Sequence, residues 1–264
     1  MKIVGLLSDF GLRDSYVAEM KAVVLSRCPE ARLVDISHEI RKFDVRMGAF
    51  VLASAARSFP EGSVFLAIVD PMVGSERMPL VVQSKRSLYV GPDNGLLMLA
   101  AIREGLQAVY CIDEQRYLSS AVSATFHGRD LFAHVVGDLA DGVPSSNIGS
   151  PVTDFVRPDF GQPIVNAGVM RCEVLHVDDF GNVITNADFS SVKRFDPTSG
   201  KRPTLLVGRR KLRLMFVRTY DEIPEGTIGC LIGSHGFLEM AMKMRNASKA
   251  IGVRPGSKLT IKSS

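Results

Sequence analysis

Short apolar runs alternate with amphipathic segments over about the first 140 residues of the chain. Continuous apolar runs are typical of buried strands, whereas apolar residues recurring every three or four positions indicate a helix with one buried face. Because strands and helices alternate, we expect a mainly parallel sheet with helices on both faces. The predicted strands cover 1–7, 31–37, 64–69, 79–84, 87–90 and 108–112, and the predicted helices cover 14–27, 45–59, 96–103 and 129–139.

The pattern changes after residues 141–163, where proline, glycine and serine indicate a linker. Only short β-like runs follow, which is typical of a small barrel or sandwich. We therefore expect an α/β domain over 1–150, a linker over 151–163 and an all-β, barrel-like domain over 164–264. The strands predicted in this second domain cover 167–177, 181–186, 203–208, 211–217, 227–233 and 258–262.

Composition narrows the class of protein. The 264 residues are 46% hydrophobic and 23% charged, which is typical of globular domains. The net charge of +4 is too close to balance to require a nucleic-acid or membrane partner. No apolar stretch reaches the roughly 18 residues of a membrane span, and the apolar start ends at Asp9, unlike a secretory signal. The four cysteines lack CxxC spacing, so we expect a soluble cytoplasmic protein with reduced thiols.

Two aspartates, Asp9 and Asp70, directly follow predicted strands. In an open parallel sheet, ligands bind in the crevice beyond the carboxyl ends of the strands. Either aspartate alone is equally well explained as a helix cap or turn former, but two at one sheet edge favour a polar site. The chain has neither a GxGxxG nor a GxxxxGK[ST] string, which argues against a dinucleotide or P-loop site.

His127 lies just before the last predicted helix of the first domain, where its side chain can face the same crevice. Asp130 and His134, four residues apart, raise the alternative of a metal site with His127. Both also belong to a polar helix stripe, so a solvated face is the better interpretation of His134. A metal-dependent hydrolase using Asp9, Asp70, His127 and Asp130 is a minor alternative.

The second domain contains two notable loops and one basic stretch. Residues 178–182, DDFGN, have turn chemistry, yet they also place an aromatic ring between carboxylates and an amide, which suits a cationic or purine-like ligand. The loop 233–236, GSHG, is most simply a tight turn, although its backbone N–H groups could bind a carboxylate. Residues 209–213 are better explained as a solvated hairpin tip than as a nucleic-acid patch.

Five longer strings occur in a fixed order along nearly the whole chain. They are SDFGLRDSYVAEMK at 8–21, VDPMVGSER at 69–77, GPDNGLL at 91–97, TFHGRDLFA at 125–133 and DDFGNVITN at 178–186. Together they resemble the S-adenosyl-L-methionine hydrolases, also called S-adenosyl-L-methionine hydroxide adenosyltransferases, which are relatives of fluorinase and chlorinase. No single string is specific, but the ordered set is.

The resemblance implies an N-terminal α/β domain, a C-terminal β-barrel domain and a homotrimer that holds substrate between the N domain of one subunit and the C domain of the next. It implies displacement at the 5′ carbon of S-adenosyl-L-methionine, giving adenosine and L-methionine when water attacks, without a metal or other cofactor. The water-handling trio of the family falls on Asp70, Arg77 and His127. The halogenating relatives differ at the Asp70 and His127 positions, so these residues favour hydrolysis over halogenation.

The chemistry of the reaction agrees with this trio. A sulfonium leaves as a neutral thioether, so the site needs no acid at the leaving group and must instead orient and partly deprotonate a water. Asp70 or His127 can accept the proton of that water, and Arg77 would hold Asp70 ionised. The sequence leaves open which of the two accepts it.

The resemblance also implies substrate-binding positions. In the first domain these are Asp9 at the ribose hydroxyls, Asp14 and Tyr16 near the methionine end, Phe43 near the ribose and sulfonium, and Phe126 beside the reacting carbon. In the second they are Asp178 at the ammonium, Phe180 and Asn182 at adenine, Ser234 and His235 at the carboxylate, and the Arg245 to Ala247 backbone at adenine.

Four positions depart from the family pattern. Met72 stands where glycine is usual, Met78 where arginine is common, His134 where proline is usual, and residues 233–235 replace an Asn-Ser-Ser run. Because Met72 and Met78 lie at the loop that carries Asp70 and Arg77, a non-catalytic adenosine- or S-adenosylmethionine-binding protein is the main alternative.

Overall fold

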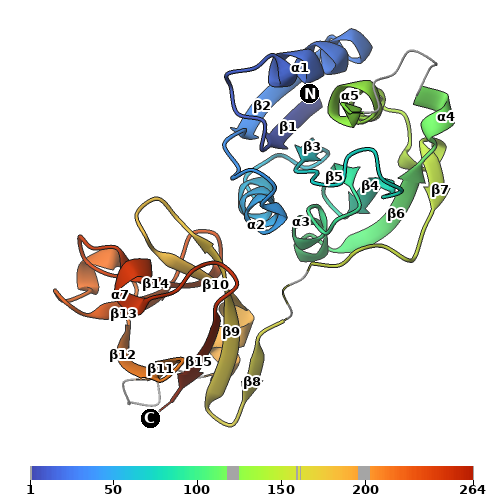
Figure 1. Ribbon diagram of the computed structural model, residues 1–264. Coiled ribbons are helices and arrows are strands. Elements are labelled where there is room, and N and C mark those ends of the chain that lie inside the picture. The colour runs from blue at the N-terminus through green and yellow to red at the C-terminus, as the bar shows by residue number, and fades with distance from the viewer. Residues whose placement is uncertain (1, 118–124, 159, 161, 196–202, 264) are drawn as a thin grey trace. The chain divides into compact units, whose positions relative to one another are not determined.

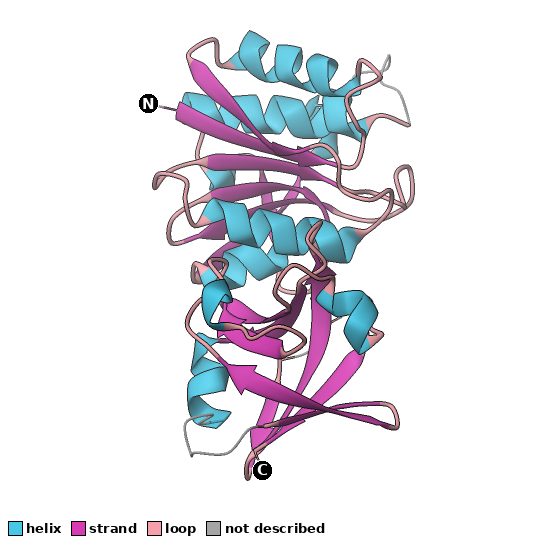
Figure 2. Ribbon diagram, turned by 90° about the vertical axis from the view of Figure 1, so that its left-hand side faces the viewer, coloured by secondary structure: helices cyan, strands magenta, loops and turns pink. Residues whose placement is uncertain are grey.

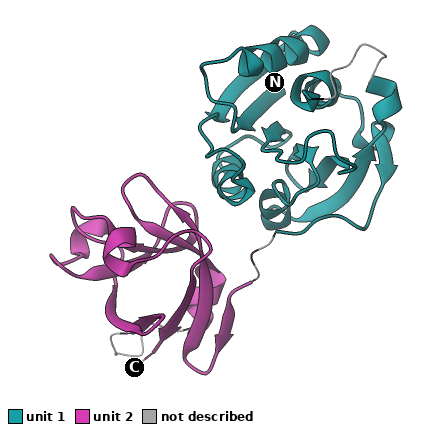
Figure 3. Ribbon diagram, viewed as in Figure 1, with its two compact units in different colours: residues 1–159 teal, residues 160–264 magenta. Residues whose placement is uncertain are grey.

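The computed structural model describes residues 2–117, 125–158, 160, 162–195 and 203–263. The chain divides into two compact units, residues 1–159 and 160–264, which Figure 3 shows in different colours. The division falls inside the segment 151–163. Each unit has its own hydrophobic core.

Unit 1 contains a seven-stranded sheet in the order β2-β1-β3-β5-β4-β6-β7. β2, β1, β3 and β5 run parallel, whereas β4 and β7 run antiparallel to their neighbours. The predicted α/β fold with a mainly parallel sheet is thus confirmed, with a mixed edge that includes the unpredicted three-residue β7. The strands are β1 (Lys2–Ser8), β2 (Ala31–Ser37), β3 (Val64–Ile68), β4 (Pro79–Ser84), β5 (Leu88–Pro92), β6 (Leu106–Ile112) and β7 (Gly149–Pro151).

Helices cover both faces of this sheet (Figures 1 and 2). Because successive strand side chains point to opposite faces, Leu6 of β1 packs into the core on one face and Leu7 into the core on the other. The first face holds α1 (Tyr16–Arg27) and α5 (Ala133–Asp141), the second holds α2 (Val45–Ala56) and α3 (Met98–Arg103), and α4 (Glu114–Tyr117) and a 3-10 turn (Ser145–Asn147) are short additions.

The chain enters α5 through a π-helical turn, Gly128–Phe132, where the sequence pattern predicts an ordinary α-helix. In this turn Ala133 N–H bonds to the Gly128 carbonyl, one residue further back than in an α-helix. Such wide turns are frequent at functional sites. This one begins directly after His127.

Unit 2 is a seven-stranded barrel, which confirms the predicted barrel-like fold. The strand order β10-β14-β13-β12-β11-β15-β9 closes because β9 also pairs with β10, and β8 is added outside on β9. Closure pairs both edges of every one of these seven described strands. The strands are β8 (Ile164–Asn166), β9 (Val169–Val177), β10 (Val183–Asp188), β11 (Thr204–Val207), β12 (Arg210–Phe216), β13 (Ile228–Ile232), β14 (Phe237–Ala241) and β15 (Lys258–Lys262).

The sequence pattern misses several elements of unit 2. β14 is buried along its whole length, but Glu239 interrupts its apolar run, and β8 has only three residues. The short helices α6 (Phe189–Phe195) and α7 (Ala247–Ile251) and the 3-10 turn Tyr220–Glu222 are too short to show a helical period.

All four cysteines are free thiols. Cys28, Cys172 and Cys230 are buried, and Cys111 is half-buried. Burial raises the pKa of Cys172 to about 12. Among the helices of the described residues, none has the length and apolar character that crossing a bilayer requires.

Candidate active site

Three side chains from separate segments meet at one end of the sheet in unit 1. Asp70 follows β3, Arg77 precedes β4, and His127 precedes the π-helical turn. Arg77 Nε donates to Asp70 Oδ2 at 2.8 Å, and Arg77 Nη2 lies 2.6 Å from the same oxygen. Arg77 Nη2 also lies 3.1 Å from His127 Nδ1. A single guanidinium therefore joins the two side chains that the sequence leaves as alternative bases.

The guanidinium of Arg77 is almost fully enclosed. The Arg77 side chain is 4% exposed and that of Asp70 is 6% exposed, and Arg77 Cζ lies 5.4 Å from the centre of the Phe132 ring. Arg77 Nη1 is buried and donates to no acceptor among the described residues. Because a buried donor without a partner is costly, an oxygen atom placed beside Nη1 would gain a strong hydrogen bond.

The contact with Arg77 determines which nitrogen of His127 carries a proton. An arginine side chain only donates, so His127 Nδ1 must accept the shared hydrogen bond. A neutral ring then holds its proton on Nε2. His127 therefore offers a donor, not a lone pair, at its remaining nitrogen.

Asp70 keeps one oxygen with accepting capacity. Oδ2 is occupied by Arg77, whereas Oδ1 accepts only the Met72 N–H, at 3.3 Å, among the described residues. Met72 is 59% exposed, and Met78 packs into the core beside α2 and α3. Both departures from the family pattern thus coexist with the intact contact between Asp70 and Arg77.

Asp9 lies at the end of β1 and is 5% exposed. Its Oδ2 accepts the Phe43 N–H at 2.8 Å, and Lys42 Nζ donates to its backbone carbonyl. Phe43 has a φ of +66°, a left-handed conformation that is strained for a residue with a Cβ, and the residue is 70% exposed. Strain of this kind clusters at ligand sites.

Tyr16, Phe126 and Phe10 form an aromatic cluster near α1. Their ring centres are 5.1 to 5.8 Å apart. Tyr16 is 45% exposed, whereas Phe126 is buried. Asp14, two residues before Tyr16, is also exposed. The structure thus brings Tyr16 and Phe126 together, although the two residues are far apart in the sequence.

No group of three or more His, Cys, Asp or Glu side chains in the described part of the chain is arranged to hold a metal ion. Asp130 pairs with Arg129, and Arg27 Nε donates to His134 Nδ1 at 3.2 Å. The prediction of a solvated face at His134 is wrong, because the contact with α1 half-buries the ring. This burial, together with the charge of Arg27, lowers the pKa of His134.

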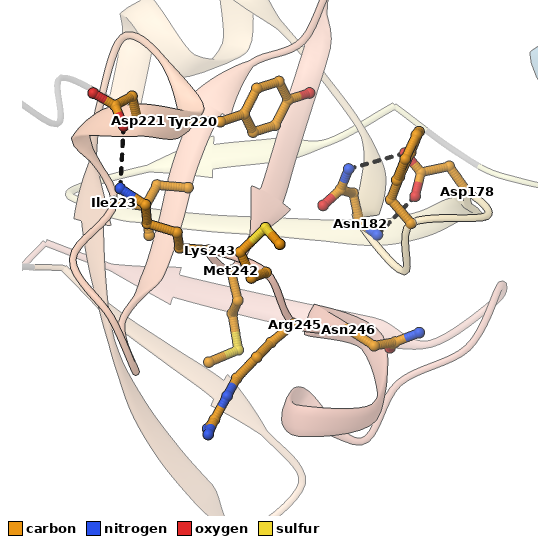
Figure 4. A pocket seen from close by; sticks show the side chains of 11 residues that line it. Asp178, Asn182, Tyr220, Asp221, Ile223, Met242, Lys243, Arg245 and Asn246 are labelled. Carbon is orange, nitrogen blue, oxygen red and sulfur yellow. Dashed lines mark hydrogen bonds and ion pairs between the residues drawn. The ribbon is translucent and has the colours of Figure 1, made fainter.

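Unit 2 contains a cavity of about 890 Å³ (Figure 4). Three predicted binding residues, Asp178, Phe180 and Asn182, line it, as does Arg245. Asn182 donates to both oxygens of Asp178, from its backbone at 2.8 Å and from its side chain at 3.0 Å. Phe180 is 83% exposed, which leaves its ring available to a ligand.

The turn that carries these residues fits tightly against α7. Gly181 has a φ of +85°, and a Cβ there would lie 2.2 Å from atoms of the Asn246 side chain. Ser248 N–H donates to the Gly181 carbonyl at 2.9 Å. The predicted backbone position Ala247 is fully buried in α7. The DDFGN string therefore forms a turn whose shape α7 fixes.

His235, which is predicted to bind the substrate carboxylate, makes hydrogen bonds within unit 2. Its Nδ1 accepts the Phe237 N–H at 3.1 Å, so its Nε2 carries the proton that faces Glu239 Oε2 at 3.0 Å. Both ring nitrogens thus bond within the chain, while Ser234 is exposed beside them. Glu239 also accepts from Tyr220 Oη at 2.7 Å.

Sequence reasoning did not identify Tyr220 or Glu239. Tyr220 lines the cavity, and burial together with Glu239 raises its pKa. Glu239 is 2% exposed within β14. An isolated glutamate inside an apolar run was the one available signal, because a buried carboxylate requires partners.

A second hollow, of about 450 Å³, lies in unit 1 between the segments 75–79 and 111–115. Arg77 and Cys111 both line it. The only partly exposed thiol among the four cysteines thus lies beside the segment that carries Arg77.

Comparisons with known proteins identify the family of the chain. Residues 4–149 match the family model described as the SAM hydroxide adenosyltransferase N-terminal domain, and residues 172–260 match the corresponding C-terminal domain. An (R)-S-adenosyl-L-methionine hydrolase of Methanocaldococcus jannaschii is 36% identical over 265 residues, which cover 96% of this chain and 93% of that protein.

Two further relatives are more distant in sequence or uncharacterised. A fluorinase of an Actinoplanes species is 26% identical over 290 residues, which cover 98% of this chain and 97% of that one. The crystal structure of an uncharacterised conserved protein from Thermotoga maritima superposes with a TM-score of 0.90 at 32% identity, covering 98% of this chain and 99% of that chain. The chain belongs to the SAM hydroxide adenosyltransferase family.

Proposed function

We propose that the protein hydrolyses S-adenosyl-L-methionine to adenosine and L-methionine by attack of water at the 5′ carbon. The proposal is supported by the family and by the hydrolase from M. jannaschii, which is more similar to this chain than the fluorinase is. The observation that carries it is Arg77, which holds Asp70 and His127 together and keeps a buried N–H, on Nη1, available for an oxygen.

Asp70 is the base that this geometry favours. A water beside Arg77 Nη1 can donate to Asp70 Oδ1, which has lone pairs available, while His127 Nε2–H donates to the oxygen of the water. As the O–C5′ bond forms, the C5′–S bond breaks, its electron pair stays on sulfur, and the proton of the water moves to Asp70. The sulfonium becomes a neutral thioether, so the leaving group needs neither an acid nor a Lewis acid.

Substrate binding is proposed for the remaining predicted positions. Buried Asp9 can accept hydrogen bonds from the ribose hydroxyls with lone pairs that Phe43 N–H leaves available. In unit 2, Phe180 offers an exposed ring for adenine, and Asn182 and Asp178 offer polar atoms beside it. The remaining proposed contacts are Asp14, Tyr16, Phe43 and Phe126 in unit 1, and Ser234, His235, Arg245 and Ala247 in unit 2.

We also propose a homotrimer in which the trio of one subunit and the unit 2 cavity of the next share one substrate. Both units expose apolar residues in the monomer. Phe43 and Met72 are 70% and 59% exposed in unit 1, and Phe180 and Met244 are 83% and 97% exposed in unit 2. A continuous apolar surface that includes these residues would mark an interaction site.

The identity of the nucleoside product tests the reaction. Purified protein incubated with S-adenosyl-L-methionine in H₂¹⁸O should release adenosine labelled at the 5′ oxygen, with activity that is insensitive to chelators. Asp70→Ala should lower kcat while adenosine still binds. Release of adenine, a 5′-halogenated nucleoside formed in high chloride, or tight binding without turnover would contradict hydrolysis.

A further inference from the structure

A buried chain of hydrogen bonds lies behind Asp9. Ser8 Oγ is 2.7 Å from His38 Nδ1, and His38 Nε2 is 3.1 Å from Asp35 Oδ1. Lys21 of α1 donates to Asp35 Oδ2 at 2.6 Å. These hydrogen bonds link the ion pair of Lys21 and Asp35 at the surface to Ser8, the residue directly before Asp9.

An irregularity between two strands creates this alignment. β1 and β2 pair in register up to Leu6 and Asp35, but the next pair is Leu7 with Ser37, so β2 carries one extra residue. His38 directly follows β2, and after this shift it contacts Ser8, the last residue of β1. β-bulges redirect side chains next to active sites in this way.

Each hydrogen bond in the chain has one consistent direction. Phe10 N–H donates to Ser8 Oγ at 3.3 Å, so the Ser8 hydroxyl can donate its own proton to His38 Nδ1. His38 Nε2–H then donates to Asp35, which accepts from Lys21 as well. The imidazole thus uses both of its nitrogens in this chain of hydrogen bonds.

His38 also holds the turn after β1 through its backbone. Gly11 N–H donates to the His38 carbonyl at 2.7 Å, and Gly11 has a φ of +73°. The His38 side chain thus fixes the residue before Asp9, and its carbonyl fixes the second residue after it. Asp9 lies in a turn that His38 holds on both sides.

The Ser8–His38–Asp35 geometry resembles a nucleophilic triad but cannot act as one. Ser8 is 0% exposed and His38 is 3% exposed, so no substrate atom reaches the hydroxyl. A nucleophile must lie within contact distance of the atom it attacks. Any effect of Ser8, His38 and Asp35 on the reaction must therefore pass through Asp9, which directly follows Ser8.

We propose that His38 is a positioning residue for Asp9, which it orients toward the ribose diol through Ser8 and the Gly11 N–H. This inference rests on the proposed hydrolase and on the ribose role of Asp9. The expected effect is confined to recognition of the diol, because the trio of Asp70, Arg77 and His127 does not include any member of this chain of hydrogen bonds.

Calorimetric titration with adenosine and with 2′,3′-dideoxyadenosine separates this role from a general structural one. His38→Ala should weaken adenosine binding about tenfold and leave dideoxyadenosine binding within about twofold, since only adenosine has the diol that is proposed to hydrogen-bond to Asp9. KM for S-adenosyl-L-methionine should rise by a similar factor, with kcat within about threefold of the unchanged protein.

Several variants make the outcome decisive. His38→Asn, whose amide oxygen can still accept from Ser8, should recover part of the lost affinity for adenosine. If His38→Ala does not fold, Ser8→Ala should show the same loss of affinity in its place. His134→Ala, which removes another half-buried histidine of unit 1, should leave the ratio of the two affinities unchanged. If His38→Ala weakens the binding of both nucleosides equally, or of neither, the positioning role is overturned. If the protein without any substitution releases no adenosine from S-adenosyl-L-methionine, the hydrolase proposal is overturned instead.

Discussion

Arg77 places one delocalised charge against two functional groups at the same time. Nε and Nη2 contact Asp70, and Nη2 also contacts His127, while Nη1 keeps a donor available. A lysine offers a single point charge in place of this planar fork. One side chain thus determines the geometry, the charge and the hydrogen-bond supply of the proposed water site.

Arg77→Lys should therefore lower kcat by about 100-fold or more, the loss typical of removing a preorganised donor, while KM changes by less than about threefold. Arg116→Lys is the matched control, because Arg116 bonds to the Asn147 carbonyl and contacts none of the trio. Steady-state kinetics of both variants check this. A large rise in KM with an unchanged kcat would show that Arg77 binds substrate and does not serve the chemical step.

Met72 contacts Asp70 through its backbone N–H. The N–H that bonds to Asp70 Oδ1 is present in every residue except proline. Met72→Gly should keep kcat within about threefold, whereas Met72→Pro should lower it by about tenfold through loss of that donor. A comparison of the two rates decides whether this departure from the family pattern matters for turnover.

The trio could be predicted from the sequence, but the assignment of the base could not. Strand-end positions and the resemblance together identify Asp70, Arg77 and His127. That His127 Nδ1 is occupied follows only from a hydrogen bond between segments 50 residues apart. Likewise, the pairing of His235 with Glu239 could not be predicted, because it depends on the unpredicted strand β14.

At the level of elements, the turn of residues 178–182 packs tightly against helix α7. Gly181→Ala should destabilise unit 2 by about 2 to 3 kcal/mol, combining the cost of a positive φ with the collision against Asn246. Gly226→Ala is the control, because Gly226 also has a positive φ but a Cβ there would meet nothing within 4 Å. Urea unfolding should show a clearly smaller loss, of about 1 to 2 kcal/mol, for the control.

The contact between α1 and α5 should make stability depend on pH through His134. Burial and the charge of Arg27 lower the pKa of His134 below its ordinary value of 6.5, although Asp138 and Asp130 oppose this. The unfolded chain therefore takes up a proton more readily, and stability falls as pH drops through 6.5 and below. His134→Gln, which keeps an acceptor for Arg27, should lose less stability between about pH 7.5 and pH 5.5 than the unchanged protein.

Elements with long apolar runs or a clear helical period could be predicted, whereas those shaped by tertiary contacts could not. β1, α1 and β3 agree with the sequence pattern to within two residues. The π-helical turn at Gly128 and the bulge in β2 leave no trace in hydrophobic periodicity, because each shifts the backbone by a single residue. Both irregularities nevertheless lie next to proposed site residues.

For the whole molecule, the two folds are predictable because unit 1 alternates strand-like and helix-like segments, whereas unit 2 has mainly short β-like runs. The proposed trimer has no such signal, but it has a sharp consequence. Mixed trimers refolded from equal amounts of Asp70→Ala and an Asp178→Ala/Phe180→Ala double variant should recover about a quarter of full activity, since random assembly gives that share of sites two intact halves. Each variant alone should be inactive, and a mixture that stays inactive would show that no site is shared.

The arrangement of the thiols makes the native enzyme a convenient subject for fluorescence work. Three cysteines are enclosed in the cores, whereas Cys111 is partly accessible and lies beside the segment of Arg77. Burial raises the pKa of Cys111 above its usual value, and Glu114 and Asp93 raise it further, so a maleimide dye should couple there slowly and faster in mild alkali. A dye attached at this single position would lie beside the segment that carries Arg77, without any engineered cysteine.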